Sequence, residues 1–289
     1  MTSRRDTALI VLMCSIWAGN YFAIKGSLNY VDPVTLSLLR AVLGGIVVLV
    51  PGYRYIRDLR RKDYAWLALI GLFNFSLFLL ALNLGLTTVS TSVASTLVYT
   101  QPVMVVALSP LVGERLSAIR TAGIVSAFLG VVVVFYPTYS HSSLTMGDLL
   151  EIGSAGSWAT AVLLFKKWGK AYNSYLVTAL QSLFGALFIA PFSYFYGVRF
   201  EPALPFWFYL SYNVLLATAL AYTLYFHVLT RMSASTFTSY LFLVPILTTL
   251  FASIIDLSLP QWYEIVGTLM VSAGIIFANY SRGQHRADS

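Results

Sequence analysis

Three residues in the first apolar run of the chain have side chains that lipid-facing helices rarely carry. The stretch IWAGNYFAIKGSLNY, residues 16–30, contains Trp17, Asn20 and Lys25. An indole N–H or a side-chain amide surrounded by hydrocarbon needs a hydrogen-bond partner. Polar side chains inside membrane spans therefore usually face the protein interior. There they can form hydrogen bonds with a bound solute, and aromatic rings can pack against it.

Trp158 is the second tryptophan that lies far from the ends of an apolar segment. Trp17 and Trp158 each stand about eleventh in their segments, which places both near the centre of a bilayer. The other tryptophans lie near segment ends, as expected for an interfacial belt. Two interpretations of the pair stay open. The two rings line a cavity, or they fill space between packed helices with each N–H bonded to a carbonyl.

Further polar and aromatic residues extend this candidate site. Asn74 and Phe78, for example, are four residues apart and share one helix face. Together with Trp17 and Trp158, the candidate substrate-binding residues are Asn20, Tyr21, Asn74, Phe78, Ser95, Tyr99, Gln101, Tyr222 and Tyr240. For each residue alone, hydrogen bonding between helices is an equally good explanation, whereas the set favours a cavity.

Charged residues are rare within the apolar segments. Lys25 and Arg40 are each close enough to a segment end to anchor at the interface, and their alternative role is to attract a substrate carboxylate. Arg40, roughly two turns inside its segment, is the harder one to explain as an anchor. Lys166 is expected to be an ordinary loop-side lysine. All acids are expected in or near loops, including Glu151, which falls within about one turn of a segment start.

The sequence lacks the motifs of intramembrane enzymes. HExxH is absent, no pair of aspartates lies deep in the segments, and His227 is the only histidine within a segment. We therefore predict no catalytic residue, no metal site and no cofactor. A channel is disfavoured because there is no selectivity-filter motif or ring of charges. A purely structural membrane protein stays open as an alternative.

Membrane-spanning helices are the elements that must position these residues. The chain has 289 residues, of which 58% are hydrophobic and only 10% are charged, whereas soluble proteins carry roughly 25% charged residues. About 20 apolar residues span a bilayer as a helix. The sequence predicts an all-α integral membrane protein with ten such helices, at 7–28, 33–52, 64–86, 90–112, 118–136, 148–168, 173–195, 206–229, 234–255 and 260–280.

Positive charge is distributed unevenly between the predicted loops. With ten spans, every Lys and Arg outside the spans except Arg199 falls on the side of the two termini. The positive-inside rule then predicts that both termini are cytoplasmic in a multi-pass protein of a bacterial inner membrane. Because this topology explains the net charge of +7, no nucleic-acid partner is expected.

The chain also repeats weakly, with an offset that drifts from 141 to 144 residues. The aligned pairs include Trp17 and Trp158, Lys25 and Lys166, Arg40 and Gln181, Ser90 and Ser233, and Pro102 and Pro245. Five helices is an odd number, so two such halves lie in the membrane with opposite orientation. The predicted repeats cover 1–136 and 148–280, followed by a cytoplasmic tail at 281–289.

Pro102 and Pro245 are predicted hinges. Each lies mid-span and follows a Ser/Thr-rich half, STSVAST at 90–96 and SASTFTS at 233–239. Proline removes a backbone donor and kinks a helix. We expect the polar halves to form two vestibules on opposite sides, although small residues also mark close helix packing.

Several stretches resemble the drug/metabolite transporter superfamily, and within it the EamA branch of ten-helix exporters. They are IWAGNYFAIK, DPVTLSLLRAVLGG and QPVMVVALSPLVGERLS. The resemblance covers nearly the whole chain and marks the fold better than the substrate. The aromatic-rich segments are further similar to the YddG-type aromatic amino-acid exporters of that branch.

The resemblance implies a secondary transporter that exports small metabolites through a central cavity between the halves. Aromatic or hydrophobic amino acids are the expected substrates, and hydrophobic drugs or organic cations are the alternative. Because no acid is expected deep in the membrane, proton coupling is expected to be weak or absent. The expected partners are a small-molecule substrate and the lipid bilayer, with the protein as a monomer.

Overall fold

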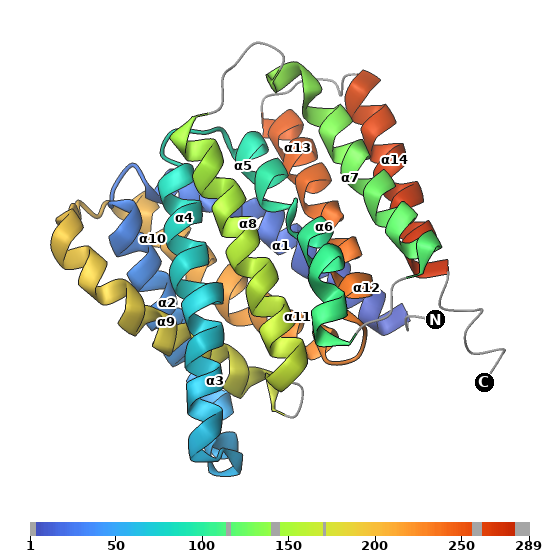
Figure 1. Ribbon diagram of the computed structural model, residues 1–289. Helices are drawn as coiled ribbons and strands as arrows, with labels where there is room; N and C mark the ends of the chain where they lie inside the picture. The colour runs from blue at the N-terminus through green and yellow to red at the C-terminus, as the bar shows by residue number, and fades with distance from the viewer. Residues whose placement is uncertain (1–3, 114–116, 140–144, 170–171, 256–261, 281–289) are drawn as a thin grey trace.

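A computed structural model describes residues 4–113, 117–139, 145–169, 172–255 and 262–280 (Figure 1). These residues are almost entirely helical, and their only extended pairing is a bridge between Val31 and Phe200. The predicted all-α class is therefore confirmed. The predicted tail at 281–289 and the basic residues Arg115 and Lys170 lie outside the described residues.

Seven helical segments of the described chain are long and apolar enough to cross a membrane. They are Arg4–Ser27 (α1), Pro33–Asp58 (α2, η1), Arg61–Gly85 (α3, η2, α4), Thr91–Val112 (α5, α6, η3), Ser174–Tyr196 (α9), Leu204–Leu229 (α10, η5, α11) and Ala234–Ile255 (α12, η6, α13). The chain is thus a multi-pass membrane protein. Three further helices lie where the fifth, sixth and tenth spans are predicted, and ten crossings stay a prediction. They are α7 (Ala118–Tyr139), α8 (Met146–Leu164, followed by η4, Phe165–Gly169) and α14 (Trp262–Tyr280).

Several of the seven segments are built from shorter elements. Their bounds are α2 Pro33–Gly52, η1 Tyr53–Asp58, α3 Arg61–Gly71, η2 Leu72–Leu77, α4 Phe78–Gly85, α5 Thr91–Val98, α6 Gln101–Leu108, η3 Ser109–Val112, α10 Leu204–Ser211, η5 Tyr212–Leu220, α11 Ala221–Leu229, α12 Ala234–Ser239, η6 Tyr240–Phe242 and α13 Leu243–Ile255. The π-helical segments η2 and η5 interrupt the third and eighth predicted spans. A π-helical turn replaces the i→i+4 hydrogen bonds of an α-helix by i→i+5 bonds, so some backbone carbonyls can accept from other groups. Such turns often occur at functional sites.

Helix starts are set by side chains at matching places in the two halves. Asp32 accepts from the backbone of Val34 and Thr35 at the start of α2, and Asn173 accepts from Tyr175 at the start of α9. Ser90 and Ser233 cap α5 and α12 in the same way. Each cap satisfies a backbone donor that a helix start leaves free. The offsets between the capping residues are 141 and 143, the same offsets that align the repeat.

Helix breaks also occur at matching places, just before the two predicted hinge prolines. A turn at Tyr99 and Thr100 separates α5 from α6, and η6 separates α12 from α13. Pro102 and Pro245 lie shortly after these breaks. Proline favours such a break because it has no backbone N–H to donate to the preceding helical turn and its ring clashes with that turn. Both prolines are buried. Their predicted role as hinges stays a prediction.

The helices form three side-by-side groups (Figure 1). The middle of the molecule holds α1, α4, α8 and α11; α1 packs on η5 and α11, and α8 packs on η2 and α4. The pair α2 and α9 packs together on one flank, and α7 packs along α14 at the other. The central group is therefore the one that can enclose a site.

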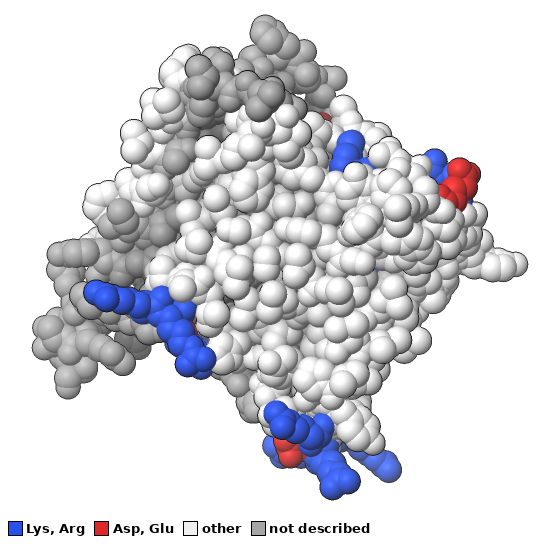
Figure 2. Space-filling view, turned by 180° about the vertical axis from the view of Figure 1, so that it is seen from behind, with Lys and Arg blue, Asp and Glu red and all other residues white. Residues whose placement is uncertain are grey.

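Exposed charged side chains gather at the two ends of this bundle. Figure 2 shows Lys and Arg gathered at two opposite margins, with a broad band between them that is almost free of charge. We call one margin the basic end. It contains the exposed Arg54 and Arg57 of η1, and Arg231, which pairs with Asp6 at 3.0 Å. The opposite end contains Arg199 and Asp32. Such a band is what a bilayer requires.

Lys25 and Lys166 each bond the carbonyl end of a helix. Lys25 Nζ donates to the carbonyls of Leu86 (2.6 Å) and Val89 (3.0 Å), just beyond the end of α4. Lys166 is buried and donates to the carbonyls of Leu229, the last residue of α11, and of Met232. Each lysine thus satisfies orphan carbonyls at a helix C-terminus and complements its dipole. The prediction that Lys166 is an ordinary loop-side lysine is wrong.

Candidate substrate-binding site

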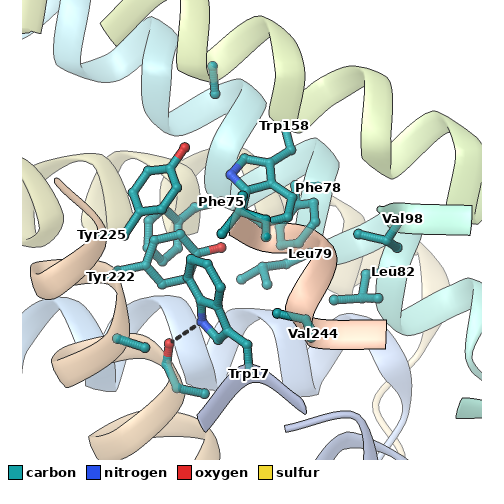
Figure 3. Close-up of a cluster of buried hydrophobic side chains, with 14 of the residues drawn as sticks. Trp17, Phe75, Phe78, Leu79, Leu82, Val98, Trp158, Tyr222, Tyr225 and Val244 are labelled. Carbon is teal, nitrogen blue, oxygen red and sulfur yellow. Dashed lines mark hydrogen bonds between the residues drawn. The ribbon is translucent and has the colours of Figure 1, made fainter. Parts of the chain in front are cut away.

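Trp17 of α1 and Trp158 of α8 meet in the middle of the bundle. Their ring centroids are 5.4 Å apart with an interplanar angle of 85°, an edge-to-face contact (Figure 3). Tyr222 contacts Trp17 at 5.3 Å, and Phe78 and Tyr99 contact Trp158 at 5.3 and 5.7 Å. In an edge-to-face pair, the positive edge of one ring meets the negative face of the other, which is a favourable arrangement. Aromatic residues from both predicted halves therefore form one continuous cluster.

The π-helical segments hold this cluster in position. Trp17 Nε1 donates to the carbonyl of Ala217 in η5 at 3.1 Å, and the Tyr212 hydroxyl of the same segment donates to the carbonyl of Ile16 at 2.9 Å. On the other side, Ser157 Oγ donates to the carbonyl of Phe73 in η2 at 2.7 Å. Each π-segment thus offers a carbonyl to the helix that it faces, in keeping with its interrupted ladder.

Trp158 differs from Trp17 in its hydrogen bonding. Trp158 Nε1 is buried, and its hydrogen-bond partner among the described residues is the Tyr225 hydroxyl, in a contact outside ideal geometry (Figure 3). A buried N–H with a poorly placed partner is a candidate for contact with a ligand. Both interpretations of the tryptophan pair hold in part, because both rings line the cavity described below and Trp17 also bonds a backbone carbonyl.

A small cavity lies within the aromatic cluster. Its lining consists of Trp17, Asn20, Tyr21, Arg40, Phe78, Leu82, Tyr99, Trp158 and Tyr222. The volume is about 20 Å³, which is room for about one water, since a water needs roughly 10–15 Å³ by this measure. The aromatic side chains therefore close over the site in this conformation.

Arg40 is the one charged residue in the lining of this cavity. The side chain is buried, with 1% of its surface exposed, and Nε and Nη1 make no hydrogen bond among the described residues. Anchoring at the membrane interface is therefore wrong for Arg40. An unpaired buried guanidinium is expensive and offers a rigid fork of donors. It is suited to a carboxylate or another planar anion.

The remaining predicted site residues lie outside the cavity lining. Asn74 Nδ2 donates to Gln181 Oε1 of α9 at 2.8 Å, and Ser95 donates to the carbonyl of Ser92 in its own helix. The backbone carbonyl of Tyr240 accepts a weak bond from Cys14 Sγ at 3.7 Å. Gln101 is buried, and its amide makes no hydrogen bond among the described residues. For Asn74 and Ser95, bonding between or within helices is thus what the structure supports.

Two residues of the cluster were missed. Tyr225 contacts Trp17 at 5.5 Å, and Phe75 contacts Tyr222 at 4.7 Å. Each lies three positions from a predicted residue, Tyr222 and Phe78 respectively. Helical spacing of i, i+3 could have identified both, because it places side chains on one face.

Glu151 of α8 lies near the start of its helix, as expected, but its surroundings differ from those of an acid beside a loop. Its side chain is fully buried, and neither carboxylate oxygen makes a hydrogen bond among the described residues. The carboxyl group packs against Gly85, the last residue of α4, where an added methyl group would collide with it. No sequence signal could have revealed this, because the position is only the second turn of its helix.

A larger pocket opens at the end of the molecule opposite to the basic end. Its volume is about 590 Å³, and Lys25, Asp32, Leu86 and Arg199 are among its lining residues. The Asp32 carboxylate accepts from the backbone N–H of Arg199 at 3.1 Å, and Arg199 donates to the carbonyl of Leu28. Lys25 therefore lies between this pocket and the bundle interior.

Comparisons with known proteins identify the family. The chain is 28% identical over 281 residues to "Uncharacterized transporter YvbV" of Bacillus subtilis, covering 95% of this chain and 92% of the relative. It is 26% identical to "Probable terminal-alkyne amino-acid exporter" of Streptantibioticus cattleyicolor, covering 93% and 92% of the two chains. A solved crystal structure matches with a TM-score of 0.80 and 20% identity over 99% of this chain and all of the other, which shows a shared fold.

The EamA-like transporter family matches the chain twice, at residues 7–136 and 145–280. Together the two matches cover most of the sequence, in agreement with the predicted resemblance. Proteins of this family and the relatives above are transporters and not enzymes. The chain therefore belongs to the EamA-like transporter family and is a multi-pass membrane transporter of small molecules.

Proposed function

We propose that this protein exports aromatic or hydrophobic amino acids. The observation that carries the proposal is Arg40, a buried guanidinium with two unpaired donor atoms inside an aromatic cavity. Arginine binds carboxylates through paired N–H donors. A solute that carries a carboxylate next to an apolar or aromatic group satisfies both features of this cavity.

The rest of the lining supports the same class of substrate. Asn20 Oδ1 is buried and makes no hydrogen bond among the described residues, so it can accept from a substrate ammonium group. The ring faces of Trp158, Phe78 and Tyr99 suit an aromatic or aliphatic side chain. A related protein is named as an exporter of amino acids, which agrees with this assignment.

Transport proceeds by alternating access between two inverted five-helix halves, residues 1–136 and 148–280. The separate family matches support two halves, as do the paired lysines and the helix caps at the repeat offsets. Both termini lie in the cytoplasm of a bacterial inner membrane, and the clustering of exposed Arg residues at the basic end supports this orientation. The cavity, now closed to about one water, opens to one side and then to the other.

Glu151 bears on whether export is coupled to protons. The expectation of downhill export without an obligatory proton depended on the absence of a buried acid. Glu151 removes that premise, since its carboxyl group is buried in the bundle. The substrate assignment does not depend on the outcome.

Counterflow in proteoliposomes tests the substrate class. Vesicles loaded with unlabelled phenylalanine should take up labelled phenylalanine and tryptophan, and those loaded with a sugar should not. The competing assignment is a hydrophobic drug or an organic cation, which aromatic rings can hold through cation–π contacts. If a quaternary ammonium solute exchanges while phenylalanine and tryptophan do not, the amino-acid assignment is wrong.

A further inference from the structure

Glu151 lies between the pocket at the opposite end and the central cavity. Its carboxylate is within electrostatic range of Lys25, which lines that pocket, and of Tyr21, which lines the cavity. Asp148, one turn earlier in α8, is the other charged group within that range. The elements packed against it here, α4 and α5, have no ionisable side chains. Glu151 thus acts electrostatically on one residue in the lining of each compartment.

The surroundings of Glu151 favour a protonated carboxyl group in this conformation. The side chain has no exposed surface, and no described residue donates to either oxygen. Lys25, the nearest candidate for an ion pair, donates instead to the carbonyls of Leu86 and Val89. Asp148 adds a second acid, whose oxygen accepts from Thr145 in a helix cap. An unpaired buried carboxylate is strongly disfavoured, so the group takes up a proton or finds a partner.

The internal repeat shows that Glu151 is not required for the shared architecture. At the offset of 141 residues that aligns Trp17 with Trp158, the counterpart of Glu151 is Ile10, which is also fully buried. Arg40 is another charged residue without a charged counterpart, since Gln181 stands at its position in the second half. Arg40 is the eighth residue of α2 and Glu151 is the sixth residue of α8, and both helices start at the opposite end. Tyr21 is within electrostatic range of both charges.

We propose that Glu151 is the proton-binding site of the transporter and that a proton and the substrate exchange in opposite directions. In one conformation the carboxylate takes up a proton from the opposite end and becomes a neutral carboxylic acid. In the other it releases that proton to the basic end. The ionised carboxylate attracts the ammonium group of an amino acid, and the protonated form does not. Substrate and proton therefore oppose each other's binding, which is the thermodynamic requirement for antiport.

The proposal rests on the proposed function for the identity of the substrate, and the experiment separates the two. Proteoliposomes are prepared with a lumen one pH unit more acidic than the bath, with the membrane potential clamped by potassium and an ionophore. A one-to-one exchange then accumulates labelled phenylalanine in the lumen up to a limit of about tenfold, because one pH unit is a tenfold gradient. Wild-type protein should approach this limit, and Glu151→Gln should stop at equal concentrations inside and outside.

Two controls accompany the variant. Glu151→Gln mimics the neutral carboxylic acid, so its counterflow without a pH gradient should be slower than that of the wild type, and a denaturant unfolding curve that matches the wild type shows that the variant is folded. Glu201→Gln removes an exposed acid at the opposite end and should accumulate phenylalanine like the wild type. The proposal is overturned if wild-type protein shows counterflow without pH-driven accumulation, or if Glu151→Gln accumulates as strongly as the wild type.

A substrate-independent measurement covers the case in which phenylalanine is not transported at all, which would be a failure of the proposed function. Infrared difference spectra of the purified protein at acidic and alkaline pH report the carbonyl band of a protonated carboxylic acid. The wild type should lose such a band on the shift to alkaline pH, and Glu151→Gln should lack that band. Identical difference spectra for the two proteins would overturn the assignment of Glu151.

Discussion

Trp17 and Trp158 meet edge to face at 5.4 Å, and their N–H groups face different partners, the carbonyl of Ala217 and the side chain of Tyr225. The two residues align in the repeat, and they come from helices that pack on opposite π-helical segments. The two residues differ in the partners of their N–H groups. Trp17 donates to the carbonyl of Ala217, whereas the N–H of Trp158 faces the Tyr225 hydroxyl, which a ligand could replace. We therefore expect a structural role for Trp17 and a substrate-binding role for Trp158.

Substitution by phenylalanine should separate these two roles. Trp17→Phe leaves a buried carbonyl unpaired, so it should lower the free energy of unfolding by about 1–3 kcal/mol more than Trp158→Phe does. Trp158→Phe should instead raise the half-saturating phenylalanine concentration several-fold. Denaturant unfolding in detergent and counterflow kinetics measure the two effects. Equal effects of the two variants on both measurements would argue against the division.

The lysines at 166 and 167 offer a matched pair for testing the helix-end contacts. Lys166→Met removes charged hydrogen bonds to two carbonyls and should lower the free energy of unfolding by about 2–3 kcal/mol. Lys167 is exposed and lies over the Trp168 ring at 4.7 Å, so Lys167→Met should cost less than about 1 kcal/mol. Unfolding curves of the two variants provide the comparison, and similar losses would mean that Lys166 is not a structural clamp.

Asn74 and Gln181 should behave as a structural pair. Asn74→Leu and Gln181→Leu should each destabilise the protein by about 1–3 kcal/mol, because each leaves a buried amide without its partner. The double variant should cost less than the sum by about 1 kcal/mol. Since neither residue lines the cavity, the half-saturating substrate concentration should stay within about twofold in every variant. A large change in affinity without coupling in stability would instead place Asn74 in the site.

Pro102 is the sharper of the two predicted hinges to test, because the break at Tyr99 adjoins the cavity. Pro102→Ala restores a backbone donor and should let α5 and α6 merge, which lowers the counterflow rate several-fold while stability is kept or increased. Pro191→Ala, at an exposed position inside α9, is the control and should transport at the wild-type rate. An unchanged rate in Pro102→Ala would remove the hinge.

The positions of the helices could be predicted well from the sequence. Long apolar segments and their caps are local signals, so the described helices begin and end close to the predicted bounds. The rare residue types in the first segment also identified the cavity, since Trp17, Asn20 and Tyr21 all line it. Their cost in a lipid environment is what made them visible.

Contacts between residues far apart in the chain could not be predicted from a single sequence. Lys166 looks like any loop-side lysine until the end of α11 is seen beside it. In the sequence, Glu151 has the position of an interfacial acid, and only the structure shows that its carboxyl group packs against Gly85. Asn74 looked like a site residue because a buried amide gives the same pattern whether it meets a substrate or Gln181. In each case the partner is distant in sequence, so only the packing of the bundle reveals it.

Competition by fragments of phenylalanine is the measurement that tests the role of Arg40 most directly. Phenylpropionate keeps the carboxylate and lacks the ammonium group, and phenethylamine keeps the ammonium group and lacks the carboxylate. Both are titrated against phenylalanine counterflow in wild-type protein and in Arg40→Gln. We expect phenylpropionate to inhibit the wild type more strongly than phenethylamine does, and this preference to be lost in Arg40→Gln, because the guanidinium is the carboxylate partner. Stronger inhibition by phenethylamine in the wild type, or an unchanged preference in Arg40→Gln, would contradict the account.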